Sequence, residues 1–571
     1  MKLIVSICFL SLALTACKSA PSKPGSFAGL FRDRDDNPEP PNPSPIPIGD
    51  EIVVGFNTAL PRLTHEEWEN TVKDAFLLDA KPGIASRFSQ DDNSTIFHND
   101  AAANRLTSNL WKDYQEAAEE LGEKIASNDG LVKKLIPEGT PSMENQARAK
   151  AILAPIIRRA YRRPATEAEL NGLSAIYLKG KELTGKQKFD NAGLKASIAA
   201  IVQSPQFIYH PEVGVADGEM AILQPYEIAT RLSYAIWKSI PDEALLTAAA
   251  TGKLATATQV KAQVARMMAD PRATDMMKYF VNELFETKKF VNLTKNEKLF
   301  PTFPNNLGDT LKREAELYIE DVVIKNNGGI TKLLTSSYTF VNDKTAPLYG
   351  VPAPKSNELT RVDLDPKTRA GIITQIGWLA SNATSERTST IHRGFYVMNR
   401  LACDEVPPMM GTDSPPVKAF KTRRDEITDK TAGCGAQCHN NYINPPAFAL
   451  EAFDAAGVYR TSENGNPIDT SGIYGQESNR DPQTSFKNAV ELMKGLSKRV
   501  TTHECFVKRA IELLYNRRTN SSDGEIVKKL GEESLGGKGT KDIMIELLTD
   551  MALLGQRSDK STSADSEGAE P

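Results

Sequence analysis

The chain of 571 residues has no excess of charge of either sign. Lysine and arginine total 69 and aspartate and glutamate total 73, which gives a formal net charge of −4 at pH 7. Because proteins that bind nucleic acid concentrate positive charge, this balance gives no reason to expect DNA or RNA as a partner. The 40% of hydrophobic and 25% of charged residues are typical of a soluble globular protein, and they exclude a disordered, collagen-like or polytopic membrane chain.

The chain also lacks the short motifs of common enzymes. It has no G-x-S-x-G nucleophile elbow, no H-E-x-x-H pair, no P-loop and no G-x-G-x-x-G loop. The alternation of polar and apolar residues that predicts strands is scarce. These absences argue against a degradative enzyme, which we keep as the third of three hypotheses.

The N-terminus has the pattern of a bacterial lipoprotein. The apolar run Leu3–Leu14 follows Lys2 and is too short to anchor a chain across a bilayer, as in a secretory signal. The sequence Leu14-Thr15-Ala16-Cys17 resembles a lipobox, in which cleavage precedes the cysteine and Cys17 carries the lipids. Lys18 in place of aspartate resembles lipoproteins sent to the outer membrane. An ordinary signal with an incidental Cys17 is the alternative.

Helical patterns dominate the body of the chain. Thr501 and Glu504 form a capping-box pattern, and the apolar residues that follow fall on one helical face. The stretch from Asp542 repeats this periodicity. We therefore predict a mainly α, multidomain, all-helical body with irregular connecting segments.

Composition shifts divide the chain into eight parts. Eight prolines between residues 18 and 50 favour an extended tether, and the polar C-terminal end has nothing to bury. The predicted parts are a signal peptide (1–16), a lipidated cysteine with a Pro-rich tether (17–50), an N-terminal helical segment (51–140), a small helical domain (141–212), a central helical domain (213–350), a domain bearing a CxxxCH motif (360–465), a C-terminal helical domain (466–556) and a disordered tail (557–571).

The CxxxCH motif consists of Cys434, Cys438 and His439. A c-type haem needs two thiols to add to its vinyl groups and an adjacent histidine to ligate the iron, usually as C-x-x-C-H. This chain has three residues between the thiols. A zinc site is less well supported, because Cys434, Cys438 and His439 supply three ligands and no clear fourth lies nearby.

The remaining cysteines provide a competing interpretation. Once Cys8 leaves with the signal and Cys17 is lipidated, four of the six cysteines remain: Cys403, Cys434, Cys438 and Cys505. In an oxidising envelope these four could form two disulfides in three connectivities. Haem on Cys434 and Cys438, with Cys403 bridging Cys505, is the other distribution.

The residues after His439 resemble a known family. They include Asn444-Pro445-Pro446-Ala447-Phe448-Ala449-Leu450-Glu451 and Phe453-Asp454. Further segments in the same order are Arg62–Thr64, Arg159–Pro164, Ser204–Phe207, Arg231–Tyr234, Pro241–Glu243, Phe340–Asn342, Tyr349–Gly350, Arg387–Ser389, Arg393–Gly394 and Asp469–Gly472. This series resembles the planctomycete cytochrome-c-like secreted proteins, which are built from serial domains of unknown function and end in a CxxCH-bearing domain.

The resemblance implies haem c on Cys434 and Cys438, with His439 as the iron-ligating residue. Some proteobacterial relatives carry cysteines that match Cys403 and Cys505, which implies a bridge between these two. The chain departs from the family pattern in its longer spacer and in Asn444, which replaces an aspartate. The family has no settled reaction, so the resemblance supplies none.

Two further hypotheses therefore stand before the enzyme. The first is an envelope lipoprotein with a haem c site at Cys434, Cys438 and His439, attached to the membrane by its lipid and exchanging electrons with an unknown redox partner. The alternative is a haem-free, disulfide-stapled binding or scaffold lipoprotein that holds an envelope polymer or another ligand.

Several residues have both a purely structural and a functional interpretation. Met409, Met410, Met493 and His503 are the nearest sequence candidates for a sixth iron ligand, but each is more typical of packing or surface. Glu451 and Asp454 lie three residues apart and could form an acid pair on one helical face. Salt bridges to Arg393 or Arg460 are the structural interpretation of this pair.

Overall fold

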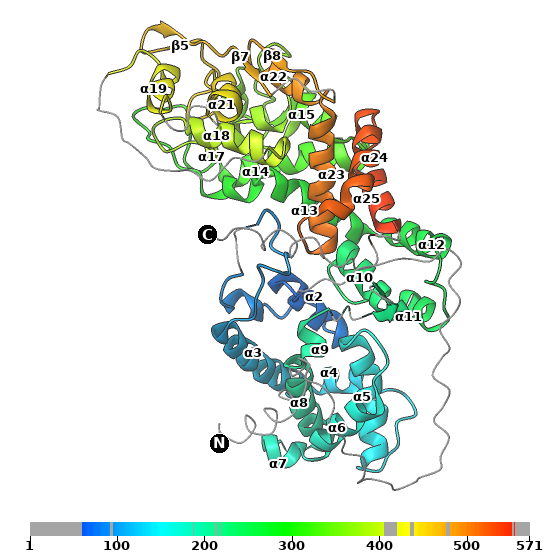
Figure 1. The fold of residues 1–571 in the computed structure, drawn as a ribbon. Helices are drawn as coiled ribbons and strands as arrows, with labels where there is room; N and C mark the ends of the chain where they lie inside the picture. The colour runs from blue at the N-terminus through cyan, green and yellow to red at the C-terminus, as the bar shows by residue number, and fades with distance from the viewer. Residues whose placement is uncertain are drawn as a thin grey trace, which may run out of the picture. The chain divides into compact units, whose positions relative to one another are not determined.

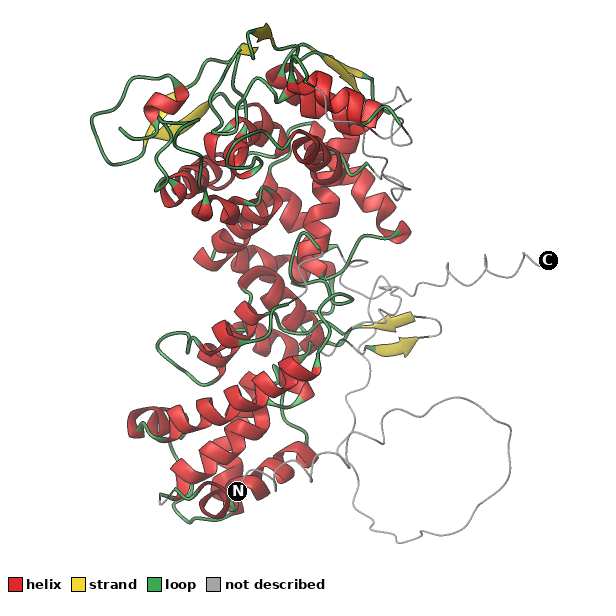
Figure 2. Cartoon of the chain, turned by 90° about the vertical axis from the view of Figure 1, so that its left-hand side faces the viewer, coloured by secondary structure: helices red, strands yellow, loops and turns green. Residues whose placement is uncertain are grey.

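The computed structural model describes residues 60–91, 95–186, 188–210, 212, 214–217, 220–404, 419–433, 439–475, 480–550 and 553. The predicted signal peptide, Cys17, the tether, Met409, Met410, Cys434, Cys438 and the tail lie outside the described residues. Within them, helices predominate and the strands form only short antiparallel pairs, as Figure 2 shows. The prediction of a mainly α, multidomain body is confirmed.

The first part of the described chain is helical. Its elements are α2 (His65–Ala75), η1 (Ile84–Arg87), α3 (Ser108–Ala126), α4 (Asp129–Leu135), α5 (Gln146–Ala160), α6 (Glu167–Leu178), α7 (Gly180–Thr184), α8 (Phe189–Val202) and α9 (Pro205–Ile208). Side chains cap several starts, and the Thr64–Glu67 capping box begins α2.

The central part adds two strand pairs. Its elements are β1 (Val215–Asp217), β2 (Met220–Ile222), α10 (Pro225–Trp237), α11 (Glu243–Ala250), α12 (Ala257–Met268), α13 (Pro271–Leu284), η2 (Thr287–Asn292), α14 (Gly308–Ile319), η3 (Glu320–Lys325), α15 (Ile330–Thr335), β3 (Tyr338–Val341), α16 (Ala346–Tyr349) and β4 (Thr360–Asp363). Strand β1 pairs with β2, and β3 pairs with β4.

The last part contains the motif-bearing segment and the C-terminal helices. Its elements are η4 (Ile372–Thr374), α17 (Ile376–Ser381), α18 (Thr390–Tyr396), η5 (Val397–Leu401), α19 (Arg423–Lys430), η6 (His439–Ile443), α21 (Asn444–Ala449), β5 (Ser462–Glu463), β6 (Asn466–Pro467), β7 (Gly472–Tyr474), β8 (Thr484–Phe486), α22 (Ala489–Leu496), α23 (Val500–Tyr515), η7 (Ser521–Asp523), α24 (Gly524–Leu535) and α25 (Thr540–Thr549). Figure 1 places α23, α24 and α25 beside one another.

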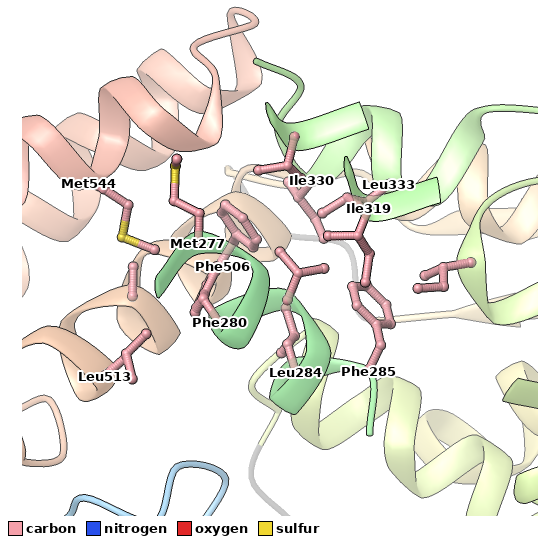
Figure 3. Packing of buried hydrophobic residues seen from close by; sticks show 14 of the residues in the cluster. Met277, Phe280, Leu284, Phe285, Ile319, Ile330, Leu333, Phe506, Leu513 and Met544 are labelled. Atoms are coloured by element: carbon pink, nitrogen blue, oxygen red, sulfur yellow. The ribbon is translucent and has the colours of Figure 1, made fainter. Parts of the chain in front are cut away.

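Two clusters of buried apolar side chains form the cores. One draws on α2, α3, α5, α6 and α8, and the other spans residues 97–553. In the second, Phe280 of α13 meets Phe506 of α23 edge to face, with ring centroids 5.1 Å apart (Figure 3). Helix α10 belongs to both cores, because Leu232 lies in the second and Tyr234 in the first.

The predicted capping box at Thr501 is wrong. Helix α23 begins earlier, at Val500, and the buried Asp481 carboxylate accepts the backbone N–H of Val500 at 2.6 Å and of Thr501 at 3.2 Å. Glu504, the other half of the predicted box, instead binds the Arg480 guanidinium. A cap supplied by a residue distant in sequence leaves no local pattern.

Among the described residues, no helix is both long and apolar enough to cross a membrane.

Candidate functional site

The bridge between Cys403 and Cys505 is present. Cys403 follows η5, Cys505 lies in α23, and their Cα atoms are 5.4 Å apart across a sequence separation of 102 residues. The predicted pairing is therefore confirmed. Of the four cysteines that follow Cys17, only Cys434 and Cys438 are left for haem or for a second disulfide.

His439 is the first described residue after these two cysteines. It begins η6, a π-helical turn, and only 8% of its surface is exposed. Its Nδ1 atom lies 3.2 Å from Oδ1 of Asn444, a residue that is itself buried. A π turn closes over five residues, and this spacing brings positions 439 and 444 together.

The hydrogen-bond network around Asn444 decides where the His439 proton lies. Thr431 donates its hydroxyl hydrogen to the Ile427 carbonyl at 2.8 Å, so the hydroxyl oxygen accepts from Asn444 Nδ2 at 2.9 Å. The amide oxygen of Asn444 therefore faces His439 and accepts the proton on Nδ1. In the neutral ring the lone pair is then on Nε2, and Nε2 makes no hydrogen bond within the described part of the chain.

A neutral imidazole with Nδ1–H bound and Nε2 free is the tautomer that ligates a metal through Nε2. The residues present thus fit the iron ligand of a c-type haem. Within the described residues, no group of three or more His, Cys, Asp or Glu side chains could hold a metal ion. A metal at His439 would therefore need ligands from outside those residues.

Close backbone packing holds η6 in place. A Cβ atom on Gly394 of α18 would lie 2.0 Å from the Ile443 carbonyl oxygen, so only glycine fits there. The neighbouring Arg393 is fully buried and donates to five carbonyl oxygens at 2.9–3.1 Å, those of Leu379, Asn382, Leu450, Phe453 and Asp454. Burial lowers the pKa of Arg393 to about 10. Arg393 and Gly394 therefore tie α17 and α18 to the chain around α21.

Glu451 and Asp454 do not form the acid pair that their spacing suggests, because α21 ends at Ala449. The buried Glu451 carboxylate accepts from the hydroxyls of Thr388 at 2.9 Å and Thr390 at 2.8 Å, and lies 3.6 Å from Arg460. Burial raises the pKa of Glu451. Asp454 accepts the backbone N–H groups of residues 456 and 458. Both carboxylates therefore act as hydrogen-bond acceptors that fix the local structure.

The structure also settles two of the sixth-ligand candidates. Both ring nitrogens of the buried His503 are hydrogen-bonded, Nδ1 to Ser534 Oγ at 2.7 Å and Nε2 to the Ser497 carbonyl at 3.0 Å. Met493 is fully buried in the second core. Both residues therefore serve packing.

Two other segments of the ordered series meet through a buried arginine. Arg162 is 1% exposed and donates to the carbonyl oxygens of Gln206 at 2.5 Å, Phe207 at 3.2 Å and Tyr209 at 2.6 Å. This joins Arg159–Pro164 to Ser204–Phe207. The segments that resemble the family therefore include residues that hold the fold together as well as candidate functional residues.

Four family models match the chain in series. They are PSD3 (DUF1587) at residues 62–127, PSD5 (DUF1595) at 148–212, PSD4 (DUF1592) at 223–351 and PSCyt3 (DUF1588) at 369–463. Each is described as a protein of unknown function, and together they cover more than half of the chain. The chain belongs to the planctomycete cytochrome-c-like family.

No curated protein and no solved structure matches this member of the planctomycete cytochrome-c-like family. Its PSCyt3 segment contains His439 together with Arg393, Gly394, Asn444 and Glu451, so the geometry above belongs to one family domain.

Sequence reasoning missed the role of Asn444, which entered only as a departure from the family pattern. A helical periodicity of 3.6 residues does not pair positions five apart. The two prolines after Asn444 do indicate a helix start at this point, since proline is favoured in a first turn. The π turn before it has no comparable signal.

Proposed function

We propose that this protein is a cell-envelope lipoprotein that carries a c-type haem on Cys434 and Cys438, with His439 as the axial ligand, and that it transfers electrons. The observation that carries the proposal is the hydrogen bond from His439 Nδ1 to Asn444, which leaves Nε2 without a hydrogen bond to the described residues. The cytochrome-c-like family supports it. A bound haem would supply a one-electron redox centre.

The chain's own residues prepare the ligand in this proposal. Thr431 orients the Asn444 amide, and Asn444 holds both the tautomer and the plane of the imidazole. Gly394 lets α18 approach η6 closely enough to bury this chain of hydrogen bonds. The buried Arg393 keeps the segment after α21 in position.

The location of the protein is part of the same proposal. Lipid on Cys17 would hold the chain at the membrane, in the periplasm and most simply at the outer membrane, and the Pro-rich tether would let the helical body reach a redox partner or an envelope polymer. Palmitate labelling that is lost in Cys17→Ala tests the lipid attachment. Unchanged labelling in this variant would contradict it.

The first test of haem is an alkaline pyridine haemochrome spectrum with an intact mass, on full chain from a host with a c-type maturation system. We expect the α band of thioether-linked haem and a matching mass increase, both lost in Cys434→Ala/Cys438→Ala. The matched control is Cys403→Ala/Cys505→Ala, which removes the other cysteine pair and should keep the haem mass.

Absence of haem, with a mass that shows two disulfides, would overturn the proposal. The remaining cysteines would then be paired with each other, because Cys403 and Cys505 are already joined. The haem-free, disulfide-stapled binding or scaffold lipoprotein would become the better account.

A further inference from the structure

The chain contains three Asn-Gly pairs, at residues 171–172, 327–328 and 464–465. In such a pair the peptide nitrogen of the glycine can attack the side-chain amide carbon of the asparagine, because glycine has no side chain to hinder the approach. The attack needs an accessible amide, a nitrogen that is not held by a hydrogen bond, and freedom to rotate the backbone between them. The three pairs differ in all of these conditions.

The Asn464-Gly465 pair lies at the exposed tip of a hairpin. Both residues have a positive φ, 49° and 77°, and they connect β5 to β6, whose register pairs Glu463 with Asn466. Asn-Gly is a preferred pair for such a two-residue turn. The Gly465 nitrogen makes no hydrogen bond to another backbone group of the described chain, and a Cβ built on Gly465 would meet nothing within 4 Å. The peptide that must react is therefore open to solvent.

Few contacts hold this turn in shape. Each strand of the hairpin contains two residues, and so short a two-stranded ladder is marginally stable by itself. The Asn464 amide donates to the Lys421 carbonyl at 3.4 Å, which is long for a hydrogen bond. A local opening that rotates the backbone of Asn464 therefore costs little free energy.

The other two pairs are protected. The side chain of Asn327 donates to Asp542 Oδ2 at 2.7 Å and accepts the backbone N–H of Lys541 at 3.0 Å. The glycine nitrogen that follows it donates to the Val322 carbonyl at 2.7 Å. Asn171 lies in the second turn of α6, where the helical ladder uses the peptide N–H groups and fixes the backbone. Both pairs must open locally before the reaction can begin.

We propose that Asn464 is a site of spontaneous deamidation and reacts fastest of the three Asn-Gly pairs. The Gly465 nitrogen loses its proton to hydroxide and forms a bond to Asn464 Cγ, while the bond from Cγ to the amide nitrogen breaks and that nitrogen leaves as ammonia with a proton from water. Water then opens the five-membered imide at either carbonyl, which leaves aspartate or isoaspartate at position 464. One water is consumed, one ammonia is released, and no oxidant or cofactor takes part. This modification goes beyond the proposed electron transfer and does not depend on haem.

Isoaspartate at this position would act on α19. It adds one carbon to the backbone, which a two-residue turn cannot accommodate while Glu463 stays in register with Asn466. The Glu463 carboxylate accepts the backbone N–H of Arg423, the first residue of α19, at 2.6 Å, and Figure 1 shows β5 beside this helix. At its other end α19 leads to Thr431, which orients Asn444. We therefore expect the conversion to loosen α19.

Peptide mapping of the full chain during incubation at mildly alkaline pH tests the site. Fragment masses locate each converted residue, and electron-based fragmentation distinguishes isoaspartate from aspartate. We expect Asn464 to convert about a hundredfold faster than Asn327, because three hydrogen bonds must first open at that pair. Asn466 is the control within the same hairpin, since Pro467 after it has no N–H and cannot attack. It should remain an amide.

Asn464→Gly is the matched variant, because it removes the amide and Gly-Gly also suits a turn with two positive φ angles. Hydrogen exchange read by mass spectrometry should become faster in α19 as the wild type ages and should stay constant in this variant. The wild-type time course needs no variant, so the site can be tested even where Asn464→Gly does not fold. The proposal is overturned if Asn464 keeps its amide as long as Asn327, if Asn466 converts equally fast, or if the converted wild type exchanges hydrogen in α19 at its original rate.

Discussion

His439 and His98 have the same side chain but are prepared for opposite chemistry. Asn444 accepts the Nδ1 proton of His439 and leaves a lone pair on Nε2, whereas Lys288 occupies Nε2 of His98 and leaves a proton on Nδ1. The free nitrogen of the first ring has a lone pair that suits a metal, whereas the free nitrogen of the second ring is a buried donor. The comparison shows that a neighbouring side chain, and not the histidine, decides what the ring can bind.

The two sites also differ in how they are assembled. Thr431, His439 and Asn444 lie within 14 consecutive residues of one family segment. The pocket that His98 lines is built from three distant stretches of the chain. Local sequence can therefore indicate the first site, while the second exists only after folding.

We expect the largest loss of stability from removing the disulfide, because it closes a long loop. Its loss would also reach the pocket, since α23 carries Cys505 and the end of α23 lines the pocket. Cys403→Ala/Cys505→Ala should lower the free energy of unfolding by about 4 kcal/mol, as estimated for a closed loop on the order of 100 residues. Urea unfolding measures the change. Reductant should shift the wild-type midpoint in the same direction and leave the variant unaffected. Equal midpoints for variant and wild type would contradict this prediction.

The His439 site should be broken selectively by Gly394→Ala. The new Cβ would lie 2.0 Å from a backbone oxygen, which cannot move like a side chain, so we expect a loss of about 3 kcal/mol. Gly172→Ala in α6 is the control, since its Cβ meets nothing within 4 Å and alanine favours a helix. Thermal unfolding should show a lower midpoint for the first variant and an unchanged or higher midpoint for the second. Equal melting of the two would show that the close approach is unimportant.

Glu314 is a buried acid that belongs to neither site. Its titration contributes to the pH dependence of stability, so it must be known before the two sites are compared at different pH values. Thr339 and Tyr349 donate to its carboxylate, and burial raises its pKa from 4.5 to about 7. Because the folded state binds the proton more tightly, this stabilisation is complete below about pH 4.5 and is lost as the pH rises through about 7. The shift corresponds to about 3 kcal/mol.

Glu314→Gln keeps an acceptor for both hydroxyls and cannot ionise. Unfolding free energies measured from pH 4 to pH 8 should therefore fall less steeply in this variant than in the wild type. Parallel pH profiles would show that Glu314 titrates normally.

The hydrogen bond that prepares His439 gives a smaller effect. Asn444→Ala leaves His439 Nδ1 and Thr431 without their buried partner and should cost about 2 kcal/mol. Asn444→Asp, the residue of the family pattern, keeps the acceptor and makes the imidazole more basic. In a haem-loaded chain it should lower the reduction potential at constant haem mass. Lys288→Gln at the other histidine is the control and should leave the potential unchanged. An unshifted reduction potential in Asn444→Asp would show that Asn444 does not influence the iron ligand. It would leave the assignment of haem to Cys434 and Cys438 unchanged.

The predictions from sequence succeeded where a pattern was local or recurred along the chain. Helical periodicity led to the mainly α fold, and the ordered markers led to the family and to the Cys403–Cys505 pair. The capping box at Thr501 was wrong, because its spacing suited a helix start but the distant Asp481 carboxylate caps α23 instead. For Glu451 the salt-bridge interpretation is confirmed by Arg460 at 3.6 Å, and the acid pair is not formed, because α21 ends at Ala449.

The sequence by itself determined the helical body and the spacing of Cys434, Cys438 and His439 along the chain, because both depend on near neighbours in the chain. Only the tertiary structure decided the tautomers of His439 and His98 and the convergence of three segments on one pocket. The physical reason is that a proton or an unpaired polar atom is placed by contacts in space. Those contacts join residues whose spacing in the sequence does not follow the regular repeat of a helix or a strand, so no sequence pattern indicates them.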